Sequence, residues 1–158
     1  MESKVIDYVT EEVYRQGHDI WAIDGIQRVG WMLDAWSYAL EYYALRLEPT
    51  VWDVVMLGKT VERCKNAPGL RRYGVKVGTR ICPPWRDVPQ LLDRLFEKAS
   101  TLTPLHFYKE FELIHPFVDG NGRTGKILLN WLNGTLLDPI FPPDDLWGPL
   151  SGHKRIRI

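Results

Sequence analysis

The chain has 158 residues, and its 20 Lys and Arg residues balance its 20 Asp and Glu residues, so its formal net charge is zero. This length suits one ordinary domain with its own core, and a composition of 45% hydrophobic and 25% charged residues excludes intrinsic disorder. A zero charge balance disfavours a protein that works mainly by neutralising nucleic-acid phosphates, so we expect no nucleic-acid partner.

Apolar residues recur at helical spacing in the first two thirds of the chain. From Ile26 to Leu47 they alternate at spacings of three and four, which predicts an amphipathic helix with one broad buried face. A proline ends this helix, and Thr50 with Asp53 forms a predicted capping box for a second one. The turn residues 66–69 stop the second helix.

A short hairpin and two further helices follow. Residues 71–81 alternate with a period near two and include β-branched side chains, which predicts one hairpin rather than a sheet. Asp87 and Gln90 form a predicted capping box for a third helix through Phe96, and Thr103-Pro104 begins a fourth.

The fourth helix ends at His115, because the residue before a proline is pushed out of the α region. A last helix is predicted from Asn121 to Asn133, with Gly134 as its cap. Prolines from residue 138 onward favour a packed surface segment. The predicted fold class is therefore mainly α, a single helical domain with one short β-hairpin.

We expect residues 1–158 to form this one domain, since no internal repeat or long linker divides them. Its core covers about residues 24–134. Residues 1–20 form an N-terminal extension, and residues 138–158 form a Pro-rich and basic C-terminal segment.

A cytoplasmic location and no membrane partner are expected. Cys64 and Cys82 are too few for a disulfide scaffold and lack a metal-binding pattern, so reduced thiols are the default. The first twenty residues contain no apolar signal-peptide core, and the longest uncharged apolar stretch, residues 127–137, is too short to span a bilayer.

The segment that carries chemistry runs from His115 to Lys126. Pro116 ends a helix and leaves the imidazole of His115 at the mouth of a loop, outside the core. Gly120–Gly122 then open a helix whose first-turn amides have no intrahelical partner, and glycines let a ligand approach the backbone. Because a helix N-terminus favours negative charge, this is a predicted anion site, most naturally for a phosphate.

Charged side chains flank this anion site. Arg123 and Lys126 lie three residues apart and can add positive charge for a polyphosphate. Asp119 can supply one oxygen to a magnesium ion that takes its other ligands from phosphates and water. His115, with an ordinary pKa of about 6.5, is suited to take a proton from a hydroxyl that attacks bound phosphorus.

Taken singly, each feature has a commoner structural explanation: a helix end, a turn, a cap or a solvated surface. The combination of these features, in this order within residues 115–126, is a specific signal. The run resembles the signature loop of the Fic family (Fic/Doc fold), His-Pro-Phe-x-Asp/Glu-Gly-Asn-Gly-Arg-x-x-Arg, and matches every fixed position except the last. The resemblance covers about residues 24–133, because Fic-like domains place helices, a β-hairpin flap and two more helices before the signature loop and its helix.

The resemblance implies a role for each matching residue. His115 would be the base that activates a Ser, Thr or Tyr hydroxyl on a target protein, Asp119 would hold magnesium, and Phe117 would anchor the loop in the core. Residues that would contact the nucleotide phosphates are Gly120, Asn121, Gly122, Arg123 and Lys126.

The predicted hairpin resembles the Fic flap, which pairs through its main chain with an extended segment of the target. Its residues are Tyr73, Gly74, Val75, Lys76, Val77, Gly78, Thr79 and Arg80. A solvated two-stranded turn with no role in binding is an equally good interpretation of the same pattern.

Lys126 stands where the family has the arginine that orients the γ-phosphate. Lysine supplies charge but not the planar, two-pronged donor array, so this orientation should be weaker or less strict.

Many relatives are restrained by a helix carrying Ser/Thr-x-x-x-Glu-Gly/Asn, whose glutamate pairs with the final arginine. The counterpart here is Ile20–Gly25, which lacks the hydroxyl and has Asp24 in place of glutamate. Asp24 is thus a candidate inhibitory residue, and the alternative is a capping box formed by Asp24 and Gln27. A separate antitoxin-like inhibitor is the other restraint that the resemblance allows.

The resemblance implies a protein adenylyltransferase that uses ATP and Mg²⁺ to place AMP on a target hydroxyl, releasing pyrophosphate. The Gly-Asn-Gly-Arg run at 120–123 favours this reaction. Two alternatives stay open. One is Doc-like transfer of the γ-phosphate, or another nucleotidyl transfer. The other is a nucleotide-binding or interaction module that is weakly active because of Lys126.

The zero net charge conceals an uneven distribution. Residues 71–86 contain five basic side chains and no acidic one. We interpret this local excess, around the predicted flap, as suited to one small polyanion held at one site. The basic side chains are Arg71, Arg72, Lys76, Arg80 and Arg86.

Overall fold

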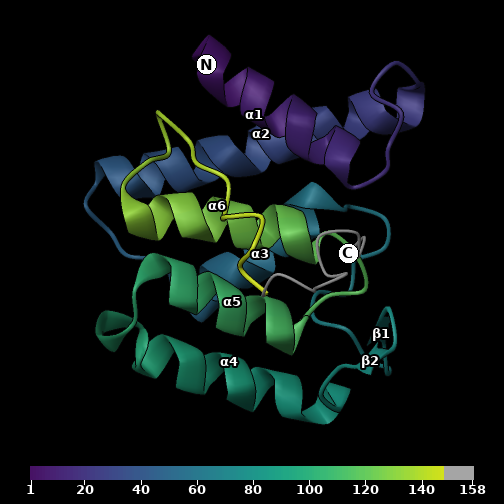
Figure 1. The fold of residues 1–158 in the computed structure, drawn as a ribbon, viewed down its shortest axis with the longest axis vertical. Coiled ribbons are helices and arrows are strands. Elements are labelled where there is room, and N and C mark those ends of the chain that lie inside the picture. Colours follow the sequence, from purple (N-terminus) through teal and green to yellow (C-terminus); the bar gives the residue numbers. More distant parts are fainter. Residues whose placement is uncertain (148–158) are drawn as a thin grey trace.

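The computed structural model describes residues 1–147, which form α-helices and one small hairpin (Figure 1). The predicted class, mainly α with one short hairpin, is confirmed. The helices are α1 (Ser3–Arg15), α2 (Ile23–Ala44), α3 (Val51–Val61), α4 (Val88–Glu97), α5 (Pro104–Ile114) and α6 (Asn121–Asn133). The strands are β1 (Lys76–Val77) and β2 (Arg80–Ile81), and two 3₁₀ turns are η1 (Trp85–Asp87) and η2 (Ala99–Thr101).

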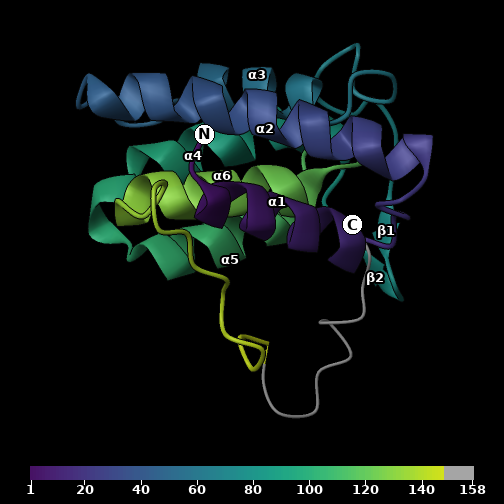
Figure 2. The same cartoon turned by 90° about the horizontal axis from the view of Figure 1, so that it is seen from above.

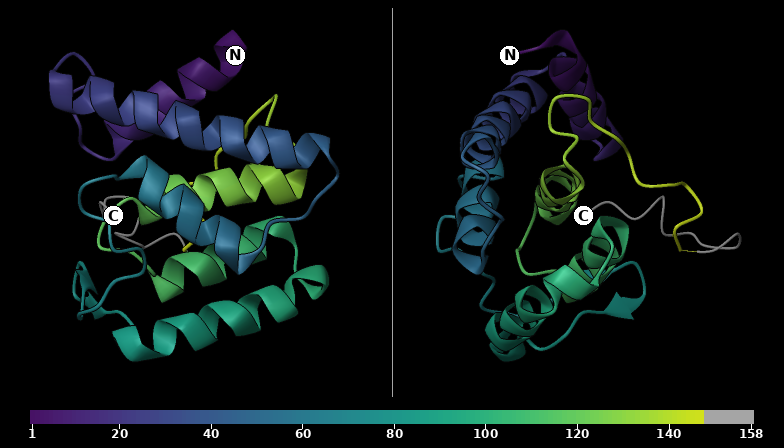
Figure 3. Two further views of the ribbon diagram at one scale, coloured as in Figure 1. Left: turned by 180° about the vertical axis from the view of Figure 1, so that it is seen from behind. Right: turned by 90° about the vertical axis from the view of Figure 1, so that its left-hand side faces the viewer.

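Helix α6 is the centre of the bundle. It packs against α2 and α3 on one side and against α5 on another, while α4 covers α5 and α1 covers α2 (Figures 1 and 3). Residues 121–131 of α6 are all buried. Because α6 is covered around its circumference, its uncharged second half is a core helix. Within residues 1–147, no helix is both long and apolar enough to cross a bilayer.

Several predicted helix ends are confirmed. Thr50 and Asp53 form the capping box of α3: the Asp53 carboxylate accepts from the Thr50 amide at 2.7 Å. Thr103 caps α5 through the His106 amide. Gly134 ends α6 with a φ of 71°, in the left-handed region that glycine adopts without a steric penalty.

Two local predictions are wrong. Asp87 makes no side-chain cap, because the 3₁₀ turn η1 carries the chain directly into α4. On α2, Ile26 is 56% exposed, and the fully buried positions include Met32, Ala35 and Ala39 on a neighbouring face. Trp36, a member of the predicted stripe, is fully buried as well, so the buried face is offset from the predicted stripe but includes part of it.

The sequence predicts only an extension for residues 1–20, but residues 3–15 form α1. Val5, Val9 and Val13 are fully buried and lie four residues apart, one turn after another. Asp7 and Glu11, which lie between these valines, are exposed and obscure the narrow apolar stripe in the sequence. Glu12 is a fully buried acid on the same face.

The hairpin is shorter than the sequence predicts. β1 and β2 are antiparallel, with Lys76 opposite Ile81 and Val77 opposite Arg80. The hairpin lies at the same end of the bundle as the loop between α5 and α6 (Figures 1 and 2). Both hairpin and loop are therefore positioned to contribute to one site.

The segment after α6 runs back over the bundle. The Tyr8 hydroxyl donates to the Ile140 carbonyl at 2.8 Å, and Phe141 stacks on the Tyr8 ring. Cys64 and Cys82 are both free thiols. Of the predicted Pro-rich and basic C-terminal segment, residues 148–158 lie outside the described residues.

Candidate functional site

The loop between α5 and α6, residues 115–120, has left-handed backbone at both ends. His115 has φ 52° and Gly120 has φ 74°. A side chain at Gly120 would also bring its Cβ to 2.9 Å from Val61 Cγ2. The chain therefore reverses within a few residues, and this tight path requires glycine at position 120.

Two buried side chains hold the loop closed. The Asn121 amide group accepts from Phe117 N at 2.8 Å and donates to Phe117 O at 3.0 Å. The Phe117 ring is fully buried against Gly58, where a Cβ would lie 2.1 Å from the ring, so the predicted anchor is confirmed. Asn121 thus uses its side chain to shape the loop, which leaves only its backbone for an anion.

His115 is buried, contrary to the expectation that its imidazole lies outside the core. The residue is 4% exposed, and its Nδ1 has no hydrogen-bond partner among residues 1–147. Burial lowers the pKa of His115 to about 4, and the charges of Arg80 and Arg71 act in the same direction against Asp119. The imidazole is therefore neutral at neutral pH and can accept a proton.

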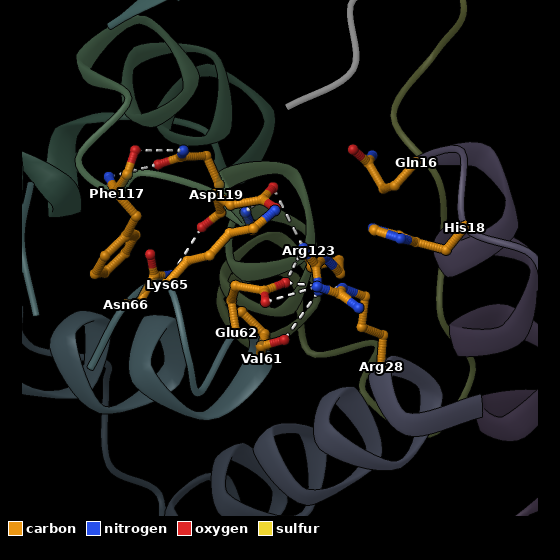
Figure 4. A network of polar contacts seen from close by, with 12 residues as sticks. Gln16, His18, Arg28, Val61, Glu62, Lys65, Asn66, Phe117, Asp119 and Arg123 are labelled. Carbon is orange, nitrogen blue, oxygen red and sulfur yellow. Dashed lines mark hydrogen bonds and ion pairs between the residues drawn. The ribbon is translucent and has the colours of Figure 1, made fainter. Parts of the chain in front are cut away.

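Asp119 lies between several donors. Its Oδ1 accepts from the Gly120 amide at 2.7 Å, and its Oδ2 accepts from Lys65 Nζ at 2.8 Å (Figure 4). Burial acts to raise the pKa of Asp119, but the hydrogen bond from Lys65 and the charge of Arg123 outweigh it and hold the pKa below its ordinary value. Asp119 is therefore an ionised carboxylate.

The Asp119 carboxylate can supply only some of the ligands that a magnesium ion needs. Residues 1–147 contain no cluster of three or more His, Cys, Asp or Glu side chains that could hold a metal ion. Magnesium at Asp119 would therefore need phosphate and water ligands as well, which is its usual coordination in phosphoryl-transfer sites. Lys65 would have to release Oδ2 for this to occur.

The N-terminus of α6 offers backbone donors to an anion. Gly120 is the N-cap residue and supplies no side-chain acceptor to the first turn. These amide groups and the positive end of the helix dipole favour negative charge. Gln16, at the end of α1, covers this position: a Cβ added at Gly122 would lie 3.0 Å from Gln16 Nε2.

Arg123 is fully buried in an ion-pair network that the sequence does not reveal (Figure 4). Its Nη1 donates to the Val61 carbonyl at 2.9 Å, and its Nη2 donates to Glu62 Oε2 at 3.0 Å and lies 3.5 Å from Asp119 Oδ1. Glu62 also accepts two hydrogen bonds from Arg28. The guanidinium of Arg123 is thus held by α3 beside Asp119.

Lys126 points into the bundle, onto a carboxylate of α1. Its Nζ lies 2.9 Å from Glu12 Oε1 and 3.4 Å from the Tyr108 hydroxyl. Burial acts to lower the pKa of Lys126, but Glu12, Tyr108 and Glu112 outweigh it and raise the pKa. Lys126 and Arg123 are therefore separately engaged, and neither is a free surface cation.

Asp24 does not contact Lys126. Its carboxylate pairs with Arg28, and Oδ2 lies 3.3 Å from His18 Nδ1. The alternative interpretation, a cap for α2, is wrong, because α2 starts after Ala22 and has no side-chain cap. Any influence of Asp24 on the loop would act through Arg28 and Glu62.

The sequence did not single out Glu12, Glu62, Lys65 or Asn66, and it indicated no separate role for Arg71. Asn66 is fully buried, and its Nδ2 donates to the carbonyls of Gly58 and Asp119, which ties α3 to the loop. Arg71 belongs to the basic cluster of residues 71–86, which was a detectable signal. Glu12 could have been found from the four-residue spacing of its valine neighbours.

A cavity of about 500 Å³ lies elsewhere, between the α2–α3 connection and the helices α4 and α5. Apolar side chains such as Phe96, Phe107 and Leu132 line this cavity, and Glu48 contributes an acidic side chain to its lining. None of the predicted site residues contributes to it, so this cavity is separate from the signature loop.

Comparisons with known proteins identify the family of the chain. A model of the Fic/DOC family matches residues 53–133. The chain is 34% identical over 110 residues to protein adenylyltransferase Fic of Drosophila persimilis, covering 62% of this chain and 21% of that protein. It is 39% identical over 82 residues to the Drosophila melanogaster protein of the same name, covering 46% of this chain and 16% of that protein. The chain thus spans about a fifth of the length of these relatives.

Solved structures share the fold. A Fic family protein from Desulfovibrio desulfuricans G20 has a TM-score of 0.65 at 20% identity, covering 82% of this chain and 47% of that one. Fic-1 from C. elegans has a TM-score of 0.65 at 22% identity, covering 88% of this chain and 50% of that one.

Proposed function

The chain belongs to the Fic/DOC family, and we propose that its signature loop transfers AMP from ATP to a Ser, Thr or Tyr hydroxyl of a target protein. The observation that carries this proposal is a neutral, buried His115 on the same short loop as an ionised Asp119 and the uncapped N-terminus of α6. A base, an acidic metal ligand and an anion site are the three groups that such a transfer needs.

The proposed reaction transfers one proton, forms one bond and breaks one bond. His115 takes the proton of the target hydroxyl, and the hydroxyl oxygen forms a bond to the α-phosphorus. The bond between the α-phosphorus and its bridging oxygen breaks, and pyrophosphate leaves. The Gly120 amide already donates to Asp119, so the backbone amides of Asn121 and Gly122 hold phosphate oxygens, and the charge of Arg123 favours them. Magnesium, when bound, neutralises phosphate charge, and Asp119 would hold it.

The hairpin is proposed as the flap that receives the target. Its short strands leave main-chain groups for pairing, and Ile81 is 74% exposed while Tyr73 is 55% exposed. Pairing through the main chain gives affinity without demanding one target sequence. We also propose that residues 1–158 act as one domain, because α1 contributes Glu12 and Gln16 to the surroundings of α6.

One specific observation favours a weakly active module as the second candidate. Lys126 lies on Glu12, so its charge is neutralised within the bundle rather than presented to a γ-phosphate. Doc-like transfer of the γ-phosphate is the remaining alternative for the same loop.

Labelled ATP separates these reactions. Wild-type protein is incubated with a cell lysate, Mg²⁺ and ATP labelled at either the α or the γ phosphorus, and modified residues are identified by mass spectrometry. We expect only the α label to stay on protein. Retention of the γ label would establish phosphate transfer instead.

Two variants test the role of His115. His115→Ala should abolish labelling while ATP affinity, measured by calorimetry, survives. His106→Ala is the matched control, because His106 lies on the exposed side of the same helix, α5. Equal lack of labelling by wild type and His115→Ala, with ATP still bound, would favour the binding module.

A further inference from the structure

Arg71 is a buried cation without a carboxylate partner. It is 2% exposed, and none of the ion pairs within residues 1–147 includes it. Burial lowers the pKa of its guanidinium. A buried charge is costly unless its donors are satisfied, so the partners that Arg71 does have must matter to the fold or to the site.

All of these partners are backbone carbonyls, and two of them end α5. The Nε of Arg71 donates to the His115 carbonyl at 2.7 Å, and Nη2 donates to the Ile114 carbonyl at 3.3 Å. The backbone amide of Arg71 donates to the Pro116 carbonyl at 2.9 Å. Arg71 thus binds three consecutive carbonyls, at the negative end of the α5 dipole.

These bonds hold His115 in an unfavourable backbone conformation. His115 is in the left-handed region with φ 52° and ψ 64°, which a non-glycine residue adopts only where its surroundings impose it. The carbonyls of Ile114 and His115 belong to the two peptide planes that flank the His115 Cα. Holding both planes fixes φ and ψ, and with them the direction of the Cα–Cβ bond from which the imidazole extends.

The same guanidinium holds both ends of the hairpin. Nη1 donates to the Tyr73 carbonyl at 3.1 Å, before β1, and Nη2 donates to the Pro83 carbonyl at 2.6 Å, after β2. Arg80 adds a second connection, since it donates to the Leu113 carbonyl at 3.1 Å. The hairpin and the end of α5 therefore share one rigid, planar donor group.

We propose that Arg71 is a positioning residue that orients His115 and couples this orientation to the hairpin. A target segment that pairs with the hairpin would thereby act on the alignment of the base. This inference rests on the proposed AMP transfer and adds the residue that connects the target-binding element to the reacting one. It also changes the interpretation of the basic cluster: Arg71 and Arg80 bind carbonyls of α5 rather than a polyanion.

Two variants separate charge from geometry, with a third as control. Arg71→Lys keeps the charge but cannot reach four carbonyls with a planar fork. Arg71→Met removes charge and donors together. Arg94→Met is the matched control, because Arg94 is the same residue type, is exposed on α4 and has no proposed role in the site.

The first measurement follows the imidazole of His115 by NMR in ¹⁵N-histidine-labelled protein and does not depend on any activity. The charged groups that act on His115 are Arg80, Arg71 and Asp119. In Arg71→Met we expect changed imidazole shifts and a His115 pKa that rises from about 4 toward its ordinary value. In Arg71→Lys we expect changed shifts with a pKa close to that of the wild type.

The second measurement is AMP-transfer kinetics. Both Arg71 variants should lose kcat on the order of 100-fold, the usual cost of a misplaced reacting group, with little change in the KM for ATP. Arg94→Met should match the wild type.

Three results would overturn the proposal. The first is unchanged imidazole shifts in folded Arg71→Met, whether or not the wild type transfers AMP. The second is an equal loss of kcat in the Arg94→Met control. The third is loss of the dispersion of amide resonances in the NMR spectra of both Arg71 variants. Such unfolding would mean that Arg71 is a structural residue only. Altered shifts in a protein whose wild type is inactive would keep the positioning role and reject the proposed function alone.

Discussion

Glu62 should contribute more to stability than any exposed acid, because it joins two buried cations. The residue is fully buried directly after α3. Its Oε1 accepts from Arg28 Nη2 at 2.8 Å, and its Oε2 accepts from Arg28 Nε at 2.9 Å and from Arg123 Nη2 at 3.0 Å. Glu62→Ala would leave the fully buried Arg123 with the Val61 carbonyl and with Asp119 Oδ1 at 3.5 Å.

The expected loss follows from the burial of this pair. Removing one partner of a buried ion pair costs about 3–5 kcal/mol, because the other charge stays buried without compensation. We therefore expect Glu62→Ala to lower the free energy of unfolding by about 3–5 kcal/mol at neutral pH. The assay is urea unfolding followed by tryptophan fluorescence and extrapolated linearly to water.

An exposed ion pair provides the control. Glu11 pairs with Arg15 on α1, and the two side chains are 50% and 45% exposed. Glu11→Ala should cost less than about 1 kcal/mol, as exposed pairs do. If Glu62→Ala destabilises the protein no more than Glu11→Ala, then Glu62 does not hold Arg123 in place and the argument fails.

Three further predictions concern the site. Lys65→Met frees Oδ2 of Asp119 and should tighten Mg²⁺ binding in the presence of a non-hydrolysable ATP analogue, measured by calorimetry; weaker binding would mean that Lys65 helps to hold phosphates instead. Lys126→Arg restores a two-pronged donor and should raise the AMP-transfer rate without abolishing ATP binding. Unchanged or lower turnover in this variant would contradict the prediction. Glu112 is buried with neither oxygen bonded, and burial raises its pKa from 4.5 to about 7. The folded state therefore retains a proton that the unfolded chain releases between these values, and stability is lost as pH rises through 7. Glu112→Gln should thus stabilise the protein more at pH 8 than at pH 5 in urea unfolding, and an equal effect at both would contradict the reasoning.

Local signals were reliable where neighbouring residues alone decide the structure. The capping box of Thr50 and Asp53, the helix end before Pro116 and the span of α6 depend on contacts within a few residues. The anchor role of Phe117 also followed from the sequence, through the resemblance of the loop to a known signature.

Predictions failed where distant segments decide burial. Ile26 belongs to an apolar stripe but is 56% exposed, whereas Met32 and Trp36 on the same helix are fully buried. His115 was expected outside the core, but its side chain is covered. A helical period shows that one face is buried, but the neighbours of that face determine which residues it includes.

The sequence by itself determined the family, the helical class and the order of the chemical groups along residues 115–126, because these depend on residue types at short spacings. Only the tertiary structure decided the partners of those groups. Glu12 reaches Lys126 across 114 positions, and Arg71 reaches the carbonyls that flank His115 across more than 40. No local pattern specifies such pairs, since each depends on the path of the whole chain through the bundle. Burial makes them matter, because a charge removed from water is stable only beside the donors and acceptors that the fold brings to it.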